Sequence, residues 1–396
     1  MIDVVIVGAG PAGLSCAIGA ARAGARVTVL DRDRLPRPRP CAGLINTAGA
    51  DELASLGIAV TGGHRIAGVR LVDGDHRMRR SFPDGGLVLE RSVLDAQLAE
   101  VAVDAGVTLI DGVEALRPLV ERGLVRGVLT DRDIDAEIAA DVVVAADGAT
   151  STFGRSLGTV RDLSWPSLLT IIGRWPSGQS HRSTLDIRLD LRRMSGELLP
   201  GHAWVVPAGD GSVSVGVSVL STARDVDSVN TTRVLEAVVE SARIDWELGA
   251  EPIAPLRGVR LPVGLSVTPA GGPSWLVVGD AAAAASPFAG LGIDRALISG
   301  RLASDALQAV METGSLSVLQ NYAPSLQAAS EPYFRVGRLF TGFAGTSVGH
   351  RVVRAAARNG VLAEALCQFG TGSFRPGAMS TVRSVAERLS WFAPRA

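Results

Sequence analysis

Within its first 31 residues the chain places a glycine-rich turn between two apolar strands, a pattern that few folds accommodate. Residues 4–7 are an unbroken β-branched run, as expected of a strand buried on both faces. The turn Gly-Ala-Gly-Pro-Ala-Gly at residues 8–13 follows, then an alanine-rich helix to about Gly24 and a second strand over residues 26–30. This is a complete βαβ unit, so the N-terminal part of the chain is predicted to be a Rossmann-like domain.

The glycines and the acid of this unit have separate tasks. Gly8 makes the tight turn, Gly10 lets the backbone approach a pyrophosphate, and Gly13 lets the helix pack close to the strand. Free N–H groups at the helix N-terminus face the phosphates. Asp31 lies 23 residues after Gly8, where its carboxylate can accept hydrogen bonds from the adenosine ribose. The spacing predicts a dinucleotide site without separating NAD from FAD.

Two later segments begin helices that belong to the same predicted domain. Residues 89–95 open a helix that extends to about Ala105, with Arg91 at its start, where the helix dipole disfavours a cation. This position indicates a partner anion such as the cofactor phosphate, although an ordinary surface arginine also fits it. Residues 141–151 form a buried strand ending in Asp-Gly before a Thr/Ser-capped helix, so Asp147 can cap that helix, can lie at the site, or can do both.

A third segment selects the cofactor. A strand from Trp275 runs into Asp280, and a glycine-bearing loop over residues 286–293 opens a helix to about Val310. Asp280 can accept a hydrogen bond from a ribityl hydroxyl. The N–H groups of Gly292 and Ile293 can face the pyrimidine end of a flavin and stabilise its anionic reduced form. The three segments together favour FAD.

Three motifs carry a resemblance to a known family. Residues 40–44, Pro-Cys-Ala-Gly-Leu, are similar to a Pro-Cys-Gly-Gly loop, and residues 201–207, Gly-His-Ala-Trp-Val-Val-Pro, to a Tyr-x-Trp-x-Phe-Pro motif. Residues 287–293, Pro-x-x-Gly-x-Gly-Ile, match a flavin loop. The chain thereby resembles the geranylgeranyl reductase family of FAD-dependent oxidoreductases, which has the glutathione-reductase-like fold and is related to aromatic hydroxylases and flavin halogenases. Four positions depart from the family pattern: Ala42, His202, Val206 and Ala283.

The resemblance implies roles for individual residues. Cys41 lies in a loop that in the family is beside the isoalloxazine, where it could modulate the substrate pocket or act in proton delivery; the alternative is a small packing residue. His202 either supplies a proton near pH 7 or is a polar strand residue without a role. Trp204 shapes an apolar pocket, and these three are the expected catalytic residues. The segment with Asp147 lies near the pyrophosphate in relatives. The expected FAD-binding residues are Gly8, Gly10, Ala12, Gly13, Asp31, Arg32, Cys41, Ala42, Arg91, Val113, Asp147, Asp280, Gly290, Gly292 and Ile293, and no metal site is expected.

The expected fold class is α/β, in three parts. Residues 1–160 plus 265–315 form a discontinuous Rossmann-like FAD-binding domain of the glutathione-reductase-like kind. Residues 161–264 read as an antiparallel β substrate domain, because several strands alternate with period two and Asp210-Gly211 is a hairpin turn signal. Residues 316–396 form a C-terminal helical region, interrupted at Gly345 and Gly370.

Three function classes stay open from the sequence. The first is reduction of carbon–carbon double bonds of a prenyl or other hydrophobic substrate by hydride transfer from reduced FAD. The second is an FAD-dependent monooxygenase that hydroxylates or epoxidises a hydrophobic secondary metabolite through a flavin C4a-hydroperoxide. The third is a flavin-containing binding protein without turnover. The electron donor is either NAD(P)H or a reductase or ferredoxin partner, and no second strand–Gly-x-Gly unit is present for a separate NADPH domain.

Composition limits the partners and the chemistry. All 39 basic residues are arginine, so no lysine is available for a Schiff base or for halogenase chemistry. A net charge of −1 argues against nucleic-acid binding. Residues 331–396 carry nine Arg and three Glu, which indicates either a solvated helical face or peripheral membrane contact. Three cysteines, the lack of an apolar run of 18 residues and the lack of a secretory signal predict a cytoplasmic protein, or one peripheral to the membrane.

Overall fold

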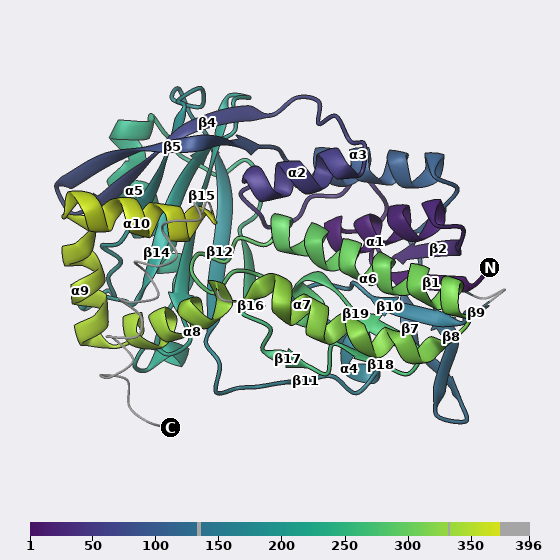
Figure 1. Ribbon diagram of the computed structural model, residues 1–396. Helices are drawn as coiled ribbons and strands as arrows, with labels where there is room; N and C mark the ends of the chain where they lie inside the picture. Colours follow the sequence, from purple (N-terminus) through teal and green to yellow (C-terminus); the bar gives the residue numbers. More distant parts are fainter. Residues whose placement is uncertain (133–135, 332, 373–396) are drawn as a thin grey trace.

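The computed structural model describes residues 1–132, 136–331 and 333–372 (Figure 1). Its first layer is a six-stranded sheet in the order β18-β19-β10-β1-β2-β6, parallel except for β18. The β-branched run predicted as a buried strand is β1, which lies between β10 and β2 at the centre of this sheet. The strands are β1 (Asp3–Val7), β2 (Arg26–Asp31), β6 (Thr108–Asp111), β10 (Val142–Ala145), β18 (Gly271–Gly272) and β19 (Trp275–Val277).

Helices cover this sheet, and the apolar core lies between the helices and the sheet. The two long ones, α1 and α6, pack very closely, since a Cβ added at Gly300 would lie 2.3 Å from the carbonyl oxygen of Ala12. Small side chains at the crossing thus allow the backbones to approach. The helices are α1 (Pro11–Arg22), α2 (Thr47–Ser55), α3 (Arg91–Asp104), α4 (Thr152–Ser156), α6 (Ile293–Thr313) and α7 (Tyr322–Ser330).

The second layer is an eight-stranded sheet in the order β16-β12-β15-β14-β13-β4-β5-β3. The predicted hairpin at Asp210-Gly211 joins β14 and β15, which pair antiparallel. The strands are β3 (Leu44–Ile45), β4 (His64–Asp73), β5 (His76–Val88), β12 (Ser167–Pro176), β13 (Thr184–Arg188), β14 (Gly201–Pro207), β15 (Ser212–Leu220) and β16 (Arg257–Pro262).

Three strands from the N-terminal half of the chain join the second sheet. Strands β3, β4 and β5, which fall within residues 1–160, pair in the eight-stranded sheet and not in the six-stranded sheet. The join is the parallel pairing of β13 with β4, in which Leu185 lies opposite Val69. This pairing links segments more than 100 residues apart in the sequence, so no local sequence pattern predicts it.

The two faces of the eight-stranded sheet have different partners. The valines at alternate positions of β15, Val213 to Val219, are buried against α5 (Thr231–Trp246). The intervening residues Gly216, Ser218 and Leu220 therefore point to the opposite face. Because both faces of β15 are covered, all nine of its residues are buried.

The C-terminal helices α8 (Tyr333–Ala344), α9 (Ser347–Ala357) and α10 (Gly360–Thr371) form a lid over the second face of this sheet (Figure 1). Asp73 at the end of β4 is buried and pairs with Arg354 and Arg358, which ties α9 to the sheet. The predicted break at Gly345 is confirmed, since α8 ends at Ala344 and α9 begins at Ser347. Helix α10 ends at Thr371, next to the predicted break at Gly370, and the residues after Gly372 lie outside the described part of the chain. A further break, which the sequence analysis did not predict, lies at Asn359, whose side chain accepts from the N–H groups of Val361 and Leu362 and so begins α10.

Short elements complete the fold. They are the three-stranded sheet of β7 (Ala115–Glu121), β8 (Leu124–Thr130) and β9 (Glu137–Ala139), and the pair β11 (Val160–Arg161) and β17 (Val267–Thr268). In the part of the chain that the structure describes, no helix has both the length and the apolar character needed to cross a membrane.

Candidate active site

One cavity of about 520 Å³ runs from the glycine-rich turn to the space between the eight-stranded sheet and the lid. Gly8, Gly10 and Asp31 line one end. Trp204 of β14 and Phe340 of α8 line the other end. Most lining residues on the sheet and the lid are apolar, whereas the end at the turn is polar. A cavity of this size with a few polar groups at one end fits a small-molecule site.

The glycine turn has the geometry that a bound dinucleotide needs. Gly8 adopts φ +114°, and a Cβ there would lie 2.3 Å from the carbonyl oxygen of Ala146. A Cβ at Gly13 would lie 2.0 Å from the carbonyl oxygen of Gly8, so the helix can approach the strand only without a side chain. A Cβ added at Gly10 would have a guanidinium nitrogen of Arg91 as its nearest atom, 3.7 Å away. The backbone of Gly10 is therefore open to the cavity. The predicted tight turn at Gly8 and the predicted close packing at Gly13 agree with this geometry.

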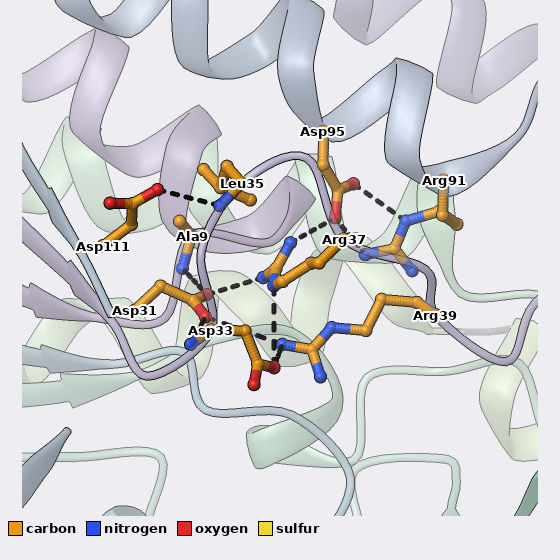
Figure 2. A network of polar contacts seen from close by, with 9 residues as sticks. All are labelled: Ala9, Asp31, Asp33, Leu35, Arg37, Arg39, Arg91, Asp95 and Asp111. Atoms are coloured by element: carbon orange, nitrogen blue, oxygen red, sulfur yellow. Dashed lines mark hydrogen bonds and ion pairs between the residues drawn. The ribbon is translucent and has the colours of Figure 1, made fainter. Parts of the chain in front are cut away.

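A buried ion network holds the turn (Figure 2). Asp31, 4% exposed, accepts from the backbone N–H of Ala9 at 2.8 Å and from Arg37 at 2.6 Å. Arg37, 5% exposed, also donates to Asp95 at 2.9 Å. Asp95 is fully buried and accepts from Arg91 at 2.9 and 3.0 Å. Asp31 therefore orients the loop itself, in addition to facing the cavity where a ribose is expected.

The sequence analysis did not find Arg37 or Asp95. One feature of the sequence could have indicated that Asp95 is buried. It follows Leu94 in a helix whose apolar residues share a face, and a carboxylate on the buried side of a helix needs a cation as its partner. Leu35 also anchors the loop, since its N–H donates to Asp111 at 2.8 Å (Figure 2). Arg39 lies at the cavity edge, 3.0 Å from Asp33, and burial and the nearby Arg37 lower its pKa.

Arg91 is not an ordinary surface arginine. Burial alone would lower the pKa of its guanidinium, but the carboxylate of Asp95 more than offsets this and the net pKa is raised. The side chain lines the cavity within reach of Gly10. A fixed cation at this point can compensate the charge of a pyrophosphate.

The two predicted aspartates that follow strands have different roles. Asp147 accepts from the Ser151 hydroxyl at 2.7 Å and from the N–H of Phe153 at 2.8 Å, so it supports the start of α4 while lining the cavity. Asp280 lines the cavity, and its carboxylate has no hydrogen-bond partner among the described residues. Burial raises its pKa, which Arg91 partly opposes. A half-buried carboxylate without a partner among the described residues is an acceptor for a ligand hydroxyl.

The flavin loop, residues 286–292, is clamped from several sides. Gly290 adopts φ +69°, and the N–H of Ser286 donates to the carbonyl oxygen of Leu291 at 2.8 Å. The Ser286 hydroxyl lies 2.7 Å from that of Tyr333 on the lid, and Phe288 packs against the rings of Tyr333 and two other lid residues. Gly292 caps α6 without a side-chain hydrogen bond, so the free N–H groups at the start of this helix face the cavity.

The three expected catalytic residues all line the cavity. The Cys41 sulfur accepts from the N–H of Gly43 at 3.4 Å. His202 is 9% exposed, and burial lowers its pKa to about 4, opposed by a hydrogen bond with the backbone of Ala289. The imidazole of His202 is therefore neutral at pH 7 and carries no extra proton to give to a substrate. Its hydrogen bond to Ala289 favours a role in positioning the flavin loop. Trp204 lies 5.7 Å from the His202 ring, and a Cβ at Gly216 would collide with its indole.

The remaining predicted FAD contacts also lie at the cavity. Ala12, Arg32, Ala42 and Val113 line it, as do Gly290, Gly292 and Ile293. Gly13 does not, in keeping with its packing role. The open backbone at Gly10, the unpartnered Asp280 carboxylate and the uncapped start of α6 fit the pyrophosphate, ribityl and pyrimidine parts of FAD. Together they define an FAD-dependent oxidoreductase of the glutathione-reductase-like fold.

Comparison with known proteins assigns the family. A model of the FAD binding domain matches residues 1–168. The chain is 34% identical to a menaquinone reductase of Mycolicibacterium smegmatis over 82% of this chain and 80% of the relative. It is 34% identical to digeranylgeranylglycerophospholipid reductase 1 of Methanopyrus kandleri, over 81% of this chain and 84% of the relative. The structure of a geranylgeranyl bacteriochlorophyll reductase-like protein from Thermoplasma acidophilum superimposes with a TM-score of 0.79 and 20% identity, covering 97% and 98%. The chain belongs to the geranylgeranyl reductase family of FAD-dependent oxidoreductases, as the motifs predicted.

Asp280 provides a direct test of the FAD site. We expect Asp280→Asn to weaken FAD retention about 10–100-fold, because a hydrogen bond to a charged group contributes about 1.5–3 kcal/mol. Without FAD the same variant should melt at or above the temperature of the parent. Burial raises the pKa of the carboxyl, so its ionised form opposes folding above that pKa and its removal does no harm. Equilibrium dialysis against FAD and thermal melting of the FAD-free protein measure the two effects. Unchanged FAD retention would remove Asp280 from the site.

Proposed function

We propose that this enzyme reduces carbon–carbon double bonds in a prenyl chain that lies in the apolar half of the cavity. The observation that carries the proposal is the continuity of the cavity, which joins the FAD cradle to the apolar face of the eight-stranded sheet beneath the lid. The two relatives named above are reductases whose names specify prenylated compounds, a quinone and a phospholipid. They favour reduction over the monooxygenase reaction, which needs the same dry pocket.

The protein's contribution is orientation and exclusion of water. FAD, when bound and reduced, supplies hydride to one alkene carbon, and the other carbon takes up a proton. The lid residues Phe340 and Phe369 and the sheet residues Leu185 and Trp204 line the cavity and keep an alkene in a dry environment. His202 holds the loop at Ala289. We propose Cys41 as the residue of this chain that contacts the reacting groups, because it lines the cavity between the cradle and the apolar half.

An anaerobic experiment tests the reaction. The enzyme-bound FAD is reduced with dithionite, a geranylgeranyl-bearing lipid is added, and flavin absorbance and product mass are followed. We expect reoxidation of the flavin with a gain of two hydrogens in the product. A flavin that stays reduced until oxygen is admitted, with a product then heavier by one oxygen atom, would make the enzyme a monooxygenase. Repeating the reduction step with NADH, NADPH or a ferredoxin identifies the electron donor.

We further propose that the outer face of the lid contacts a membrane surface from which the substrate enters. Val348 and Val352 on α9 and Val361 on α10 are 59%, 47% and 80% exposed, and Arg351 is exposed beside them. Apolar side chains next to arginines suit an anionic lipid surface. Four of the nine arginines of the basic C-terminal segment, at positions 375, 383, 388 and 395, lie outside the described residues.

Exposed positions allow this contact to be tested without harm to the fold. We expect Val352→Asp/Val361→Asp to weaken binding to vesicles containing anionic phospholipid by about tenfold or more, since each apolar side chain withdrawn from water contributes up to about 1.5–3 kcal/mol. Co-sedimentation with the vesicles measures this. Ile244→Asp is the matched control, because Ile244 is 92% exposed on α5, on the far side of the eight-stranded sheet. Equal binding by the double variant and the parent would rule out this lid face as the contact.

A further inference from the structure

The cavity separates into a charged half and an uncharged half. The charged lining residues all come from the FAD-binding part of the chain. They are Asp31, Arg32, Arg37, Arg39, Arg91, Glu114, Asp147 and Asp280. On the eight-stranded sheet and the lid, the described lining residues include no Asp, Glu or Arg. The two histidines there, His202 and His350, are buried, and burial lowers the pKa of each, so both are neutral. An anionic group has no countercharge in this half.

A row of polar side chains nevertheless crosses the apolar sheet. Thr170 of β12 lies opposite Ser218 of β15, and Ser218 lies opposite His202 of β14. All three line the cavity. Their neighbours on this face are apolar, Leu168 and Leu220 on one side of the row and Ile172 on the other. A polar row at the centre of such a face is costly unless a partner satisfies it.

The hydrogen bonds within the row leave donors unused. The hydroxyl oxygens of Thr170 and Ser218 are 2.7 Å apart, so one hydroxyl donates to the other. Two hydroxyls carry two protons and share one bond, and the second hydroxyl proton makes no hydrogen bond to another of the described residues. Two register pairs away on the same face of the sheet, the buried indole N–H of Trp204 also has no partner in the described part of the chain. His202 already uses a ring nitrogen on Ala289.

We propose that the free hydroxyl proton of the Thr170–Ser218 pair and the indole N–H of Trp204 bind a carbonyl oxygen of the substrate, so that the enzyme selects an uncharged, carbonyl-bearing prenylated ring. The inference rests on the proposed function and names its substrate class. A carbonyl oxygen has two lone pairs and can accept from both donors. The phosphate of a prenylated phospholipid requires cations, which this half of the cavity lacks.

Binding to the oxidised holoenzyme tests the inference separately from catalysis. The probes are 2-methyl-3-geranylgeranyl-1,4-naphthoquinone and the same prenylated naphthalene without the two carbonyl oxygens. Equilibrium dialysis gives the Kd of each for the parent, for Thr170→Val/Ser218→Ala and for Trp204→Phe. We expect the parent to bind the quinone at least tenfold more tightly than the naphthalene, and each variant to lose most of that preference while binding the naphthalene as the parent does.

Matched controls distinguish recognition from a structural role. Ser214→Ala changes a serine of the same strand and face that does not line the cavity, and it should leave the preference intact. Equal affinities of the parent for both probes, or parallel weakening of both by the variants, would overturn the inference. A changed flavin absorption spectrum in the ligand-free Thr170→Val/Ser218→Ala variant would place the row against the flavin and overturn it too. Tighter binding of a geranylgeranylated glycerophospholipid than of the quinone would do the same.

Failure of the proposed function has a different signature. If the parent shows the quinone preference but the reduced enzyme adds no hydrogen to the prenyl chain of either probe, the recognition inference is supported and the reaction is not reduction. If the enzyme reduces the chain without any preference for the quinone, the reaction stands and the recognition inference fails.

Discussion

Arg37→Leu is expected to abolish FAD retention and to lower the free energy of unfolding by about 3–5 kcal/mol, the usual cost of removing one partner from a buried ion pair. Arg37 bridges Asp31 and Asp95, which are 4% and 0% exposed. Its loss leaves Asp31 with only the backbone donors and the more distant Arg39, 3.6 Å away. Denaturant unfolding and the flavin absorbance of the purified protein measure the two effects.

Arg39→Leu is the matched control: its side chain is 28% exposed and pairs with the partly exposed Asp33, so it should cost less than about 1 kcal/mol. Equal losses in the two variants would show that the network is not the source of the stability.

The βαβ unit and the FAD segments could be predicted because their signals are local. The three glycines follow one another within six residues, and the spacing to Asp31 is set by one helix and one strand, so the pattern is visible in a short stretch of sequence. The contact of Gly8 with Ala146 is long-range and was not visible in that stretch. The flavin loop is equally local, because its glycines precede the helix that they begin.

The ion network could not be predicted, since its members come from separate segments. Arg37 lies in a loop without secondary structure, and its partner Asp95 lies 58 residues later in α3. Arginine and aspartate are also common on surfaces, so neither residue type marks a buried pair. Only the tertiary fold brings them together beside Arg91.

The position of the lid and the place of β3, β4 and β5 in the eight-stranded sheet were not predicted, for a related reason. Helical periodicity shows that residues 333–371 form helices with an apolar face, but it does not say which surface that face covers. In the structure α10 contacts β5 and α9 contacts β4, strands that the sequence analysis assigned to the other domain. The polar row of Thr170, Ser218 and His202 became visible only when the register of three strands was known.

Gly8→Ala is the second large effect that the structure predicts. Gly8 adopts φ +114°, a conformation that costs an alanine about 1–3 kcal/mol. The added Cβ would also lie 2.3 Å from the carbonyl oxygen of Ala146 and 2.7 Å from its carbonyl carbon, which are backbone atoms at the end of β10. Relieving this clash must shift β1 or β10 at the centre of the parallel sheet, which adds about 1–3 kcal/mol. We therefore expect a loss of about 3–5 kcal/mol and no detectable FAD binding.

Gly24→Ala separates the backbone cost from the steric cost. Gly24 has a comparable φ of +98°, but a Cβ there would meet no atom within 4 Å. It should lose only the conformational part, about 1–2 kcal/mol, and retain FAD. Chemical denaturation and FAD titration of both variants give the comparison. Equal destabilisation of the two variants, with FAD retained in both, would mean that β1 and β10 can accommodate a side chain at the turn. The close approach of Gly8 to Ala146 would then not be required for FAD binding.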